Sequence, residues 1–165
     1  EAVALNAGYL VTEVLDKVDN GIETLILDAS AACHMPDVLE MPYTPPLRGA
    51  QIIKNIKEYK NVTAGKDIQE NEDIRKYKDK KEYRENVYRL SSYTCLAGDI
   101  IGDYKFDSKI NIGDRLVFED MAIYSMVKNN TFNGIGLPDI CLLHEDGAIE
   151  TVKCFGYEDF KNRLS

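Results

Sequence analysis

The 165-residue chain has few cysteines, no long apolar run and no excess of basic residues, and each shortage excludes a class of protein. No stretch approaches the ~18 consecutive apolar residues that a membrane-spanning helix needs. The four cysteines form no C-x-x-C pair, so they fit neither a zinc site nor a disulfide-dense secreted scaffold, and we expect no metal. The net charge of −8 disfavours nucleic acid as a partner and favours a small cationic ligand.

The residues that are present have the composition of one folded domain. Hydrophobic residues make up 44% of the chain and charged residues 29%, values typical of a globular protein with a core. The chain opens without the basic and apolar regions of a signal peptide, so we expect a cytoplasmic protein with reduced thiols. Apolar residues follow Glu1 at once, as they do inside a strand, and we therefore expect a piece of a longer protein.

Short apolar runs separated by turn residues predict a mostly β domain. Asn20-Gly21 lies between two such runs and is typical of a β-hairpin turn. At regular spacing, these strands predict an antiparallel β-sandwich or barrel, closed by a helical turn at Tyr157–Leu164. The predicted strands cover residues within 2–15, 24–27, 87–90, 100–104, 112–118, 122–127, 140–143 and 149–152, the last two forming a second hairpin.

Two segments interrupt the strand pattern. Four of the five prolines fall within residues 29–49, which predicts an ordered extended loop or a sheet edge. Residues 51–86 contain no proline and are dense in charge, with helical spacing at Ile52, Ile53 and Ile56. We expect a charged, partly helical or mobile insertion that carries no chemistry and that the fold can lose.

Residue types and positions leave several candidate functional residues open. Cys95 precedes small turn-forming residues, so it is either an exposed thiol beside a tight turn or a buried, inert cysteine. Asp28 ends an apolar strand, which suits a ligand or a turn cap equally. His34 and Asp37 lie on the irregular loop, and Tyr124 lies in a predicted strand where a core tyrosine is the default. Composition alone therefore stops at an acidic β domain.

Four motifs carry the interpretation further, because in this order they resemble the carboxynorspermidine/carboxyspermidine decarboxylases. The likeness covers nearly all of residues 1–50 and 87–165. The motifs are ACHMPDVLEMPY at 32–43, TCLAGDIIGDY at 94–104, GDRLVFEDMAIY at 113–124 running on to TFNGI at 131–135, and FGYEDFK at 155–161.

The resemblance implies the C-terminal β domain of a fold-III enzyme that uses pyridoxal 5'-phosphate. In that family an N-terminal β/α barrel, here outside the chain, carries the lysine that binds the cofactor, and two subunits share their active sites. Cys95 matches the cysteine that returns a proton to the substrate after carbon dioxide leaves, and Tyr124 matches a tyrosine that binds the cofactor phosphate. This chain alone is therefore expected to be inactive.

The same resemblance suggests residues for the polyamine end of the substrate. Glu1, His34 and Asp37 are the candidates, with Asp28 and Asp99 behind them. Acidic side chains at fixed spacing would bind the ammonium groups of such a substrate.

Two alternatives remain open. The first is a related decarboxylase that acts on ornithine or diaminopimelate. Those relatives have an acidic residue where this chain has Leu96, which disfavours them. The second is a free-standing β domain that binds a partner without catalysis, and the start of the chain within a strand pattern disfavours it.

Overall fold

The computed structural model describes residues 6–41, 43–54, 56 and 86–164. The predicted substrate residue Glu1 and nearly all of the predicted 51–86 insertion lie outside the described residues. Within the described part, no helix is long and apolar enough to cross a membrane.

The strands are β1 (Leu10–Asp19), β2 (Glu23–Leu27), β3 (Ala50–Ile52), β4 (Val87–Ser92), β5 (Ile100–Phe106), β6 (Arg115–Phe118), β7 (Ile140–Leu143) and β8 (Ile149–Lys153). The helices are α1 (Ala31–His34), α2 (Asp37–Glu40), α5 (Tyr124–Val127), the 3₁₀ turn η2 (Phe132–Gly134) and α6 (Tyr157–Leu164).

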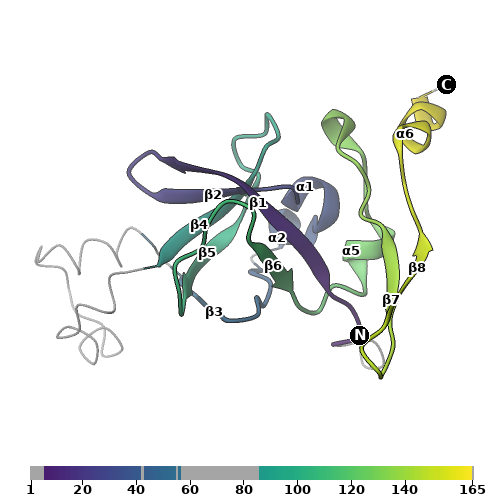
Figure 1. The fold of residues 1–165 in the computed structure, drawn as a ribbon. Coiled ribbons are helices and arrows are strands. Elements are labelled where there is room, and N and C mark those ends of the chain that lie inside the picture. Colours follow the sequence, from purple (N-terminus) through teal and green to yellow (C-terminus); the bar gives the residue numbers. More distant parts are fainter. Residues whose placement is uncertain (1–5, 42, 55, 57–85, 165) are drawn as a thin grey trace, which may run out of the picture.

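Six strands form one curled sheet in the order β3-β5-β4-β2-β1-β6 (Figure 1). All neighbours are antiparallel except β2 and β4, so the predicted mostly β fold is confirmed and the sheet is mixed. Just before the edge strand β3, Leu47 bridges to Phe118 of β6, and Arg48 N–H donates to the Val117 carbonyl at 3.0 Å. The two edges of the sheet therefore approach each other and partly close it.

The predicted hairpin at Asn20-Gly21 is confirmed as β1–β2. Asp19 pairs with Glu23, and the Asp19 carboxylate accepts a hydrogen bond from Gly21 N–H at 2.9 Å. Gly21 has φ of 83°, a left-handed conformation that glycine adopts without steric cost.

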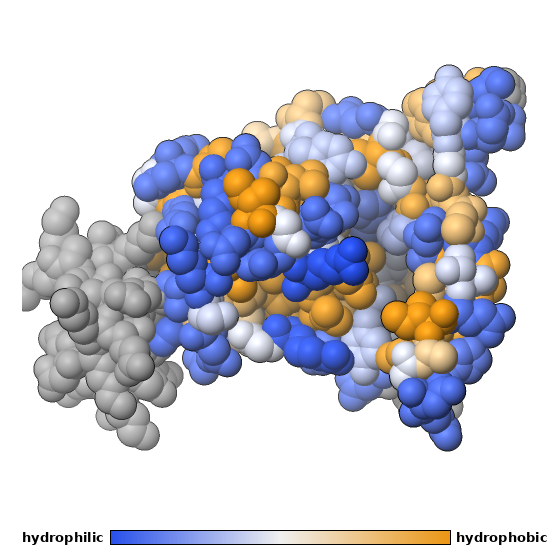
Figure 2. All heavy atoms as spheres, viewed as in Figure 1, coloured by the Kyte–Doolittle hydropathy of each residue, from blue (hydrophilic) through white to orange (hydrophobic). Residues whose placement is uncertain are grey.

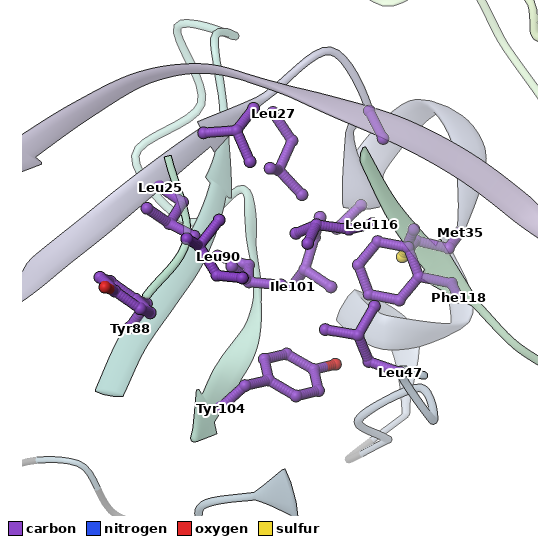
Figure 3. Packing of buried hydrophobic residues seen from close by; sticks show 14 of the residues in the cluster. Leu25, Leu27, Met35, Leu47, Tyr88, Leu90, Ile101, Tyr104, Leu116 and Phe118 are labelled. Carbon is purple, nitrogen blue, oxygen red and sulfur yellow. The ribbon is translucent and has the colours of Figure 1, made fainter. Parts of the chain in front are cut away.

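The core lies inside the curl of the sheet. Alternate residues of a strand point to one face, so Leu25 and Leu27 of β2 both reach the interior, where each is 0% exposed. They belong to one cluster with residues from other strands of the sheet, including Leu90, Ile101 and Phe118 (Figure 3). Since roughly 25 cal/mol is gained per Å² of apolar surface removed from water, this cluster dominates the stability of the sheet.

The predicted extended loop at 29–49 is wrong in part, because it contains the short helices α1 and α2. Ser30 explains the first helix: its hydroxyl caps α1 by accepting from Cys33 N–H at 3.1 Å. Pro36 precedes α2, where its fixed φ suits a helix start. Ile52, expected in a helix, lies in β3.

The strand predicted at 122–127 is also wrong, since residues 124–127 form the helical turn α5. The chain here passes very close to Gly8, where an added Cβ would come within 2.8 Å of Ala122. The backbone then closes a turn in which Lys128 N–H donates to the Tyr124 carbonyl at 2.9 Å. Among the described residues, no strand pairs with this segment, so the segment does not form part of a sheet.

The last hairpin, β7–β8, forms a separate two-stranded sheet beside the main one and leads to α6 (Figure 1). Both the hairpin and the terminal helix confirm the sequence prediction. Several large apolar side chains of this hairpin are exposed, Leu143 by 63% and Ile149 by 72%, and orange apolar spheres are visible on it in Figure 2. The hairpin thus contributes little buried surface within the described residues.

Candidate active site

Cys95 lies on the turn that joins β4 to β5, and its thiol is exposed. The turn is closed by Asp99 N–H, which donates to the Leu96 carbonyl at 2.9 Å. Of the two possibilities that the sequence left open, the structure shows the exposed thiol. Cys33 is the opposite case, because it is fully buried and burial raises the pKa of its thiol.

The buried side chain of Asp99 stabilises this turn by accepting hydrogen bonds. It is 1% exposed, and its carboxylate accepts hydrogen bonds from the hydroxyls of Ser30 at 2.7 Å and Thr94 at 2.5 Å and from Ala32 N–H at 3.2 Å. A buried carboxylate is tolerated when hydrogen-bond donors surround it. Asp99 therefore ties the Cys95 turn to the start of α1.

His34, at the other end of α1, is 3% exposed and both of its ring nitrogens have partners. Nδ1 accepts from Ser30 N–H at 3.1 Å, so the proton is on Nε2, which donates to the Gly136 carbonyl at 3.0 Å. Burial lowers the pKa of His34, against smaller opposing effects of the Gly136 carbonyl and nearby carboxylates. The imidazole is thus neutral and joins α1 to the segment after η2.

The loop around η2 docks on the same short helix. The Asn130 side-chain amide donates to the Ala32 carbonyl at 2.7 Å, and Asn130 N–H donates to the Cys33 carbonyl at 3.1 Å. The Cys33 thiol also lies 3.7 Å from the Phe132 carbonyl. Helix α1 therefore holds two loops that are far apart in the sequence, one carrying Cys95 and the other carrying η2.

An open hollow lies next to α1, between α2 and α5. Asp37, Tyr43, Asp120 and Tyr124 supply its polar groups, and methionines and other apolar side chains line the rest. Tyr124 is 45% exposed, and no hydrogen bond within the described residues engages its hydroxyl.

One corner of the site already surrounds an ammonium group. Lys128 Nζ is 3.1 Å from Asp37 Oδ1 and 2.7 Å from Glu40 Oε2, and it lies 4.7 Å from the centre of the Tyr124 ring. The hydrogen bond to Glu40, and after it the one to Asp37, raises the pKa of Lys128. Two carboxylates and an aromatic face form a suitable environment for an alkylammonium group.

The predicted site residues divide into two groups. Cys95 and Tyr124 are exposed and Asp37 is partly exposed, whereas His34 and Asp99 are buried and bind the Gly136 carbonyl and the start of α1. Asp28 is a strand cap, because its carboxylate accepts from the Thr12 hydroxyl and from Glu13 N–H at 2.9 Å.

Sequence reasoning missed Lys128 and Asn133. The sequence assigns no role to Asn133, yet the Asn133 side-chain amide lies 3.2 Å from Cys95 Sγ. The TFNGI motif contained the only signal for it. Nothing in the sequence pairs Lys128 with residues that lie about 90 positions earlier.

The mostly β fold, the exposed cysteine on the β4–β5 turn and the tyrosine at the hollow together point to one class of protein. The chain belongs to the pyridoxal-dependent decarboxylases, as their C-terminal sheet domain, and the family model matches residues 2–122.

Within that class, two similar proteins have names that specify the substrate. The chain is 40% identical over 164 residues to the carboxyaminopropylagmatine decarboxylase of Synechocystis sp., and the match covers 99% of the chain and 35% of that enzyme. It is also 40% identical over 163 residues to the carboxynorspermidine/carboxyspermidine decarboxylase of Campylobacter jejuni, covering 99% of the chain and 38% of the enzyme. The resemblance seen in the motifs is therefore confirmed, and the chain spans little more than a third of the length of these relatives.

Solved structures agree. The crystal structure of carboxynorspermidine decarboxylase from C. jejuni, complexed with norspermidine, superimposes with a TM-score of 0.78 at 38% identity, covering 99% of this chain and 40% of that one. A diaminopimelate decarboxylase from M. jannaschii has a TM-score of 0.61 at 15% identity, covering 96% of this chain and 30% of that one. The second likeness concerns the fold alone.

Proposed function

We propose that this chain is the C-terminal part of a pyridoxal-phosphate-dependent decarboxylase that converts carboxynorspermidine or carboxyspermidine to norspermidine or spermidine and carbon dioxide. The observation that supports it most is the 40% identity to the C. jejuni enzyme, which extends over 99% of the chain and so includes both loops held by α1. The remainder of the enzyme would be a β/α barrel with the cofactor-binding lysine, in a cytoplasmic homodimer with shared active sites.

Cys95 is the proton donor in this proposal. Pyridoxal phosphate, when bound, supplies the electron sink that allows carbon dioxide to leave. The substrate carbon then needs a proton, and the exposed thiol on the β4–β5 turn can deliver one. The turn is fixed by the buried Asp99, so the position of the thiol is set before substrate arrives.

Tyr124 fits the proposed contact to the cofactor phosphate. Tyr124 is exposed and lines the hollow, and no hydrogen bond within the described residues engages its hydroxyl. A phenol hydroxyl donates well to a phosphate oxygen. The residue would orient the cofactor and take no part in proton transfer.

Asp37 and Glu1 would bind the ammonium groups of the substrate. The contact of Asp37 with the ammonium group of Lys128 supports this role. His34 and Asp99 would act from beneath by holding the loops. The net charge of −8 would also attract a polycation.

A second substrate, carboxyaminopropylagmatine, has independent support. The Synechocystis enzyme with that name is as similar to this chain, at 40% identity, as the C. jejuni enzyme is. Both substrates are carboxylated polyamines, and they differ in the cationic group at the far end.

The test uses the full-length protein that contains this chain. Its kcat/KM is measured on carboxynorspermidine, carboxyspermidine and carboxyaminopropylagmatine, with ornithine and diaminopimelate as controls. We expect a carboxylated polyamine to be preferred, and Cys95→Ala to lower turnover by about 10²-fold or more, as for a positioned acid.

Cys141→Ala is the matched control, because it removes another exposed thiol, on the β7–β8 hairpin, and should leave turnover unchanged. Mixing Cys95→Ala subunits with subunits that lack the barrel lysine should restore part of the activity if the sites are shared. Preference for ornithine or diaminopimelate, or normal turnover in Cys95→Ala, would contradict the proposal.

A further inference from the structure

Asn133 contacts the thiol of Cys95 across a separation of 38 residues in the sequence. Its side-chain Nδ2 lies 3.2 Å from Cys95 Sγ. The contact joins the β4–β5 turn to the η2 loop, so it exists only because both loops are held in place. Helix α1 holds them, through Asp99 on one side and Asn130 on the other.

The backbone at Asn133 directs its side chain. Asn133 has φ of 59° and ψ of 16°, a left-handed conformation that asparagine tolerates better than most residues. Gly134 N–H donates to the Thr131 carbonyl at 2.9 Å, and Arg163 of α6 lies 3.4 Å from the Thr131 hydroxyl. The residue before it, Phe132, is bound to Asn130 by a hydrogen bond of 3.0 Å. The asparagine is thus fixed from both sides.

An amide N–H beside sulfur has two chemical consequences. It occupies one lone pair of the sulfur, so the thiol proton points away from Asn133 and toward open space. When the S–H bond breaks and a C–H bond forms on the substrate, the electron pair stays on sulfur, and the amide then donates to a thiolate. Hydrogen bonds to a charged acceptor are stronger than those to a neutral one.

We propose that Asn133 is a positioning residue for Cys95, which aims the thiol proton at the substrate carbon and stabilises the thiolate that remains. The proposal rests on the proposed role of Cys95 as proton donor. It adds a residue of the η2 loop to the chemistry of the β4–β5 turn.

Two variants of the full-length protein test it. Asn133→Gly removes the amide and keeps the left-handed backbone without steric cost. Asn133→Asp keeps the shape of the side chain and replaces the donor by a carboxylate, which repels a thiolate. The readout is the rate at which iodoacetamide alkylates Cys95 at pH 8 without cofactor or substrate, measured on the Cys95 peptide by mass spectrometry, since Cys141 and Cys154 are also exposed.

We expect alkylation to fall about tenfold in Asn133→Gly, for the loss of one hydrogen bond to a charged acceptor. Asn133→Asp should be about a further fivefold slower, for a like charge at contact distance in water. Turnover should fall in the same order with KM nearly unchanged, and more aldehyde should form in place of the amine product as protonation at the correct carbon slows. Thermal midpoints should match the wild type.

If Asn133→Gly is alkylated as fast as the wild type, the amide does not stabilise the thiolate and the inference is wrong. The Cys95→Ala variant separates this from the proposed function. When Cys95→Ala is inactive while both Asn133 variants behave as the wild type, Cys95 remains the acid and only the role of Asn133 is lost.

Discussion

The described residues up to 122 and those after 122 bury apolar side chains to very different extents. Every member of the hydrophobic core cluster lies at or before Met121. After it, the strand β8 and the helix α6 contain no buried residue. The first region, the six-stranded sheet with α1 and α2, is therefore stabilised by its own core. The second region, called the tail below, depends for its stability on contacts with other parts of the protein.

The candidate functional residues are distributed over both regions, unlike the residues of the core. The candidate thiol Cys95 lies in the first region, whereas Tyr124 and Asn133 lie in the tail. Contacts from α1 and α2 hold the part of the tail that carries Tyr124 and Asn133. The candidate site thus lies where the tail contacts the first region. Each prediction below concerns one of the two regions or a contact between them.

The largest effect is expected from a matched pair of leucines. Leu25→Ala removes a side chain that is 0% exposed in the sheet, and Leu143→Ala removes one that is 63% exposed in the hairpin. We expect Leu25→Ala to lower the free energy of unfolding by about 3 kcal/mol. Leu143→Ala should change it by less than about 0.5 kcal/mol. Urea unfolding of the 165-residue chain measures both, and equal losses would show that the tail is as well packed as the sheet.

Asp99→Asn acts on the link between the Cys95 turn and α1. Three donors would lose a charged acceptor, and we expect about 2 kcal/mol of destabilisation, as for hydrogen bonds to an ionised group. Asp107→Asn, an exposed residue after β5, is the control and should change stability little. Turnover of the full-length protein should also fall in Asp99→Asn. A variant as stable and active as the wild type would show that the turn holds its shape without the carboxylate.

Acid should weaken the link that His34 makes between α1 and Gly136. The folded pKa lies below the ordinary value of 6.5, so below that pH the unfolded chain binds more protons and stability falls. The slope is at most about 1.4 kcal/mol per pH unit. Urea unfolding between pH 7.5 and 5.5 should show this loss in the wild type and in His144→Gln, and His34→Gln should lack it. An unchanged slope in His34→Gln would assign the loss to other groups.

The smallest effect is expected at the surface contact between α2 and Lys128. If Asp37 binds the substrate, Lys128→Gln frees its carboxylate and should lower KM about twofold to threefold, as for one screened charge. Asp37→Asn should raise KM by a similar factor. Glu40→Gln serves as the control, because it weakens the same lysine contact and leaves Asp37 intact. If neither Lys128→Gln nor Asp37→Asn alters KM, Asp37 is not part of the substrate site.

Strand patterns and turns were predictable because they depend on neighbours in the sequence. The hairpin at Asn20-Gly21, the strands β4 to β6 and the last hairpin were all predicted. The errors fell on residues 29–49 and 122–127, where a hydroxyl cap and a close approach to Gly8 decide the conformation. Neither is a local property of apolar periodicity.

By itself, the sequence determined that this is an acidic, mostly β domain. Its long motifs also determined the family, because the motifs and their order can be recognised from the sequence alone. Only the tertiary structure decided where the candidate residues lie and what they contact. It placed His34 and Asp99 beneath the surface, left Cys95 and Tyr124 open, and brought Asn133 within 3.2 Å of the thiol. The reason is physical: burial and contact between distant loops depend on how α1 holds both of them, and no spacing in the sequence encodes that distance.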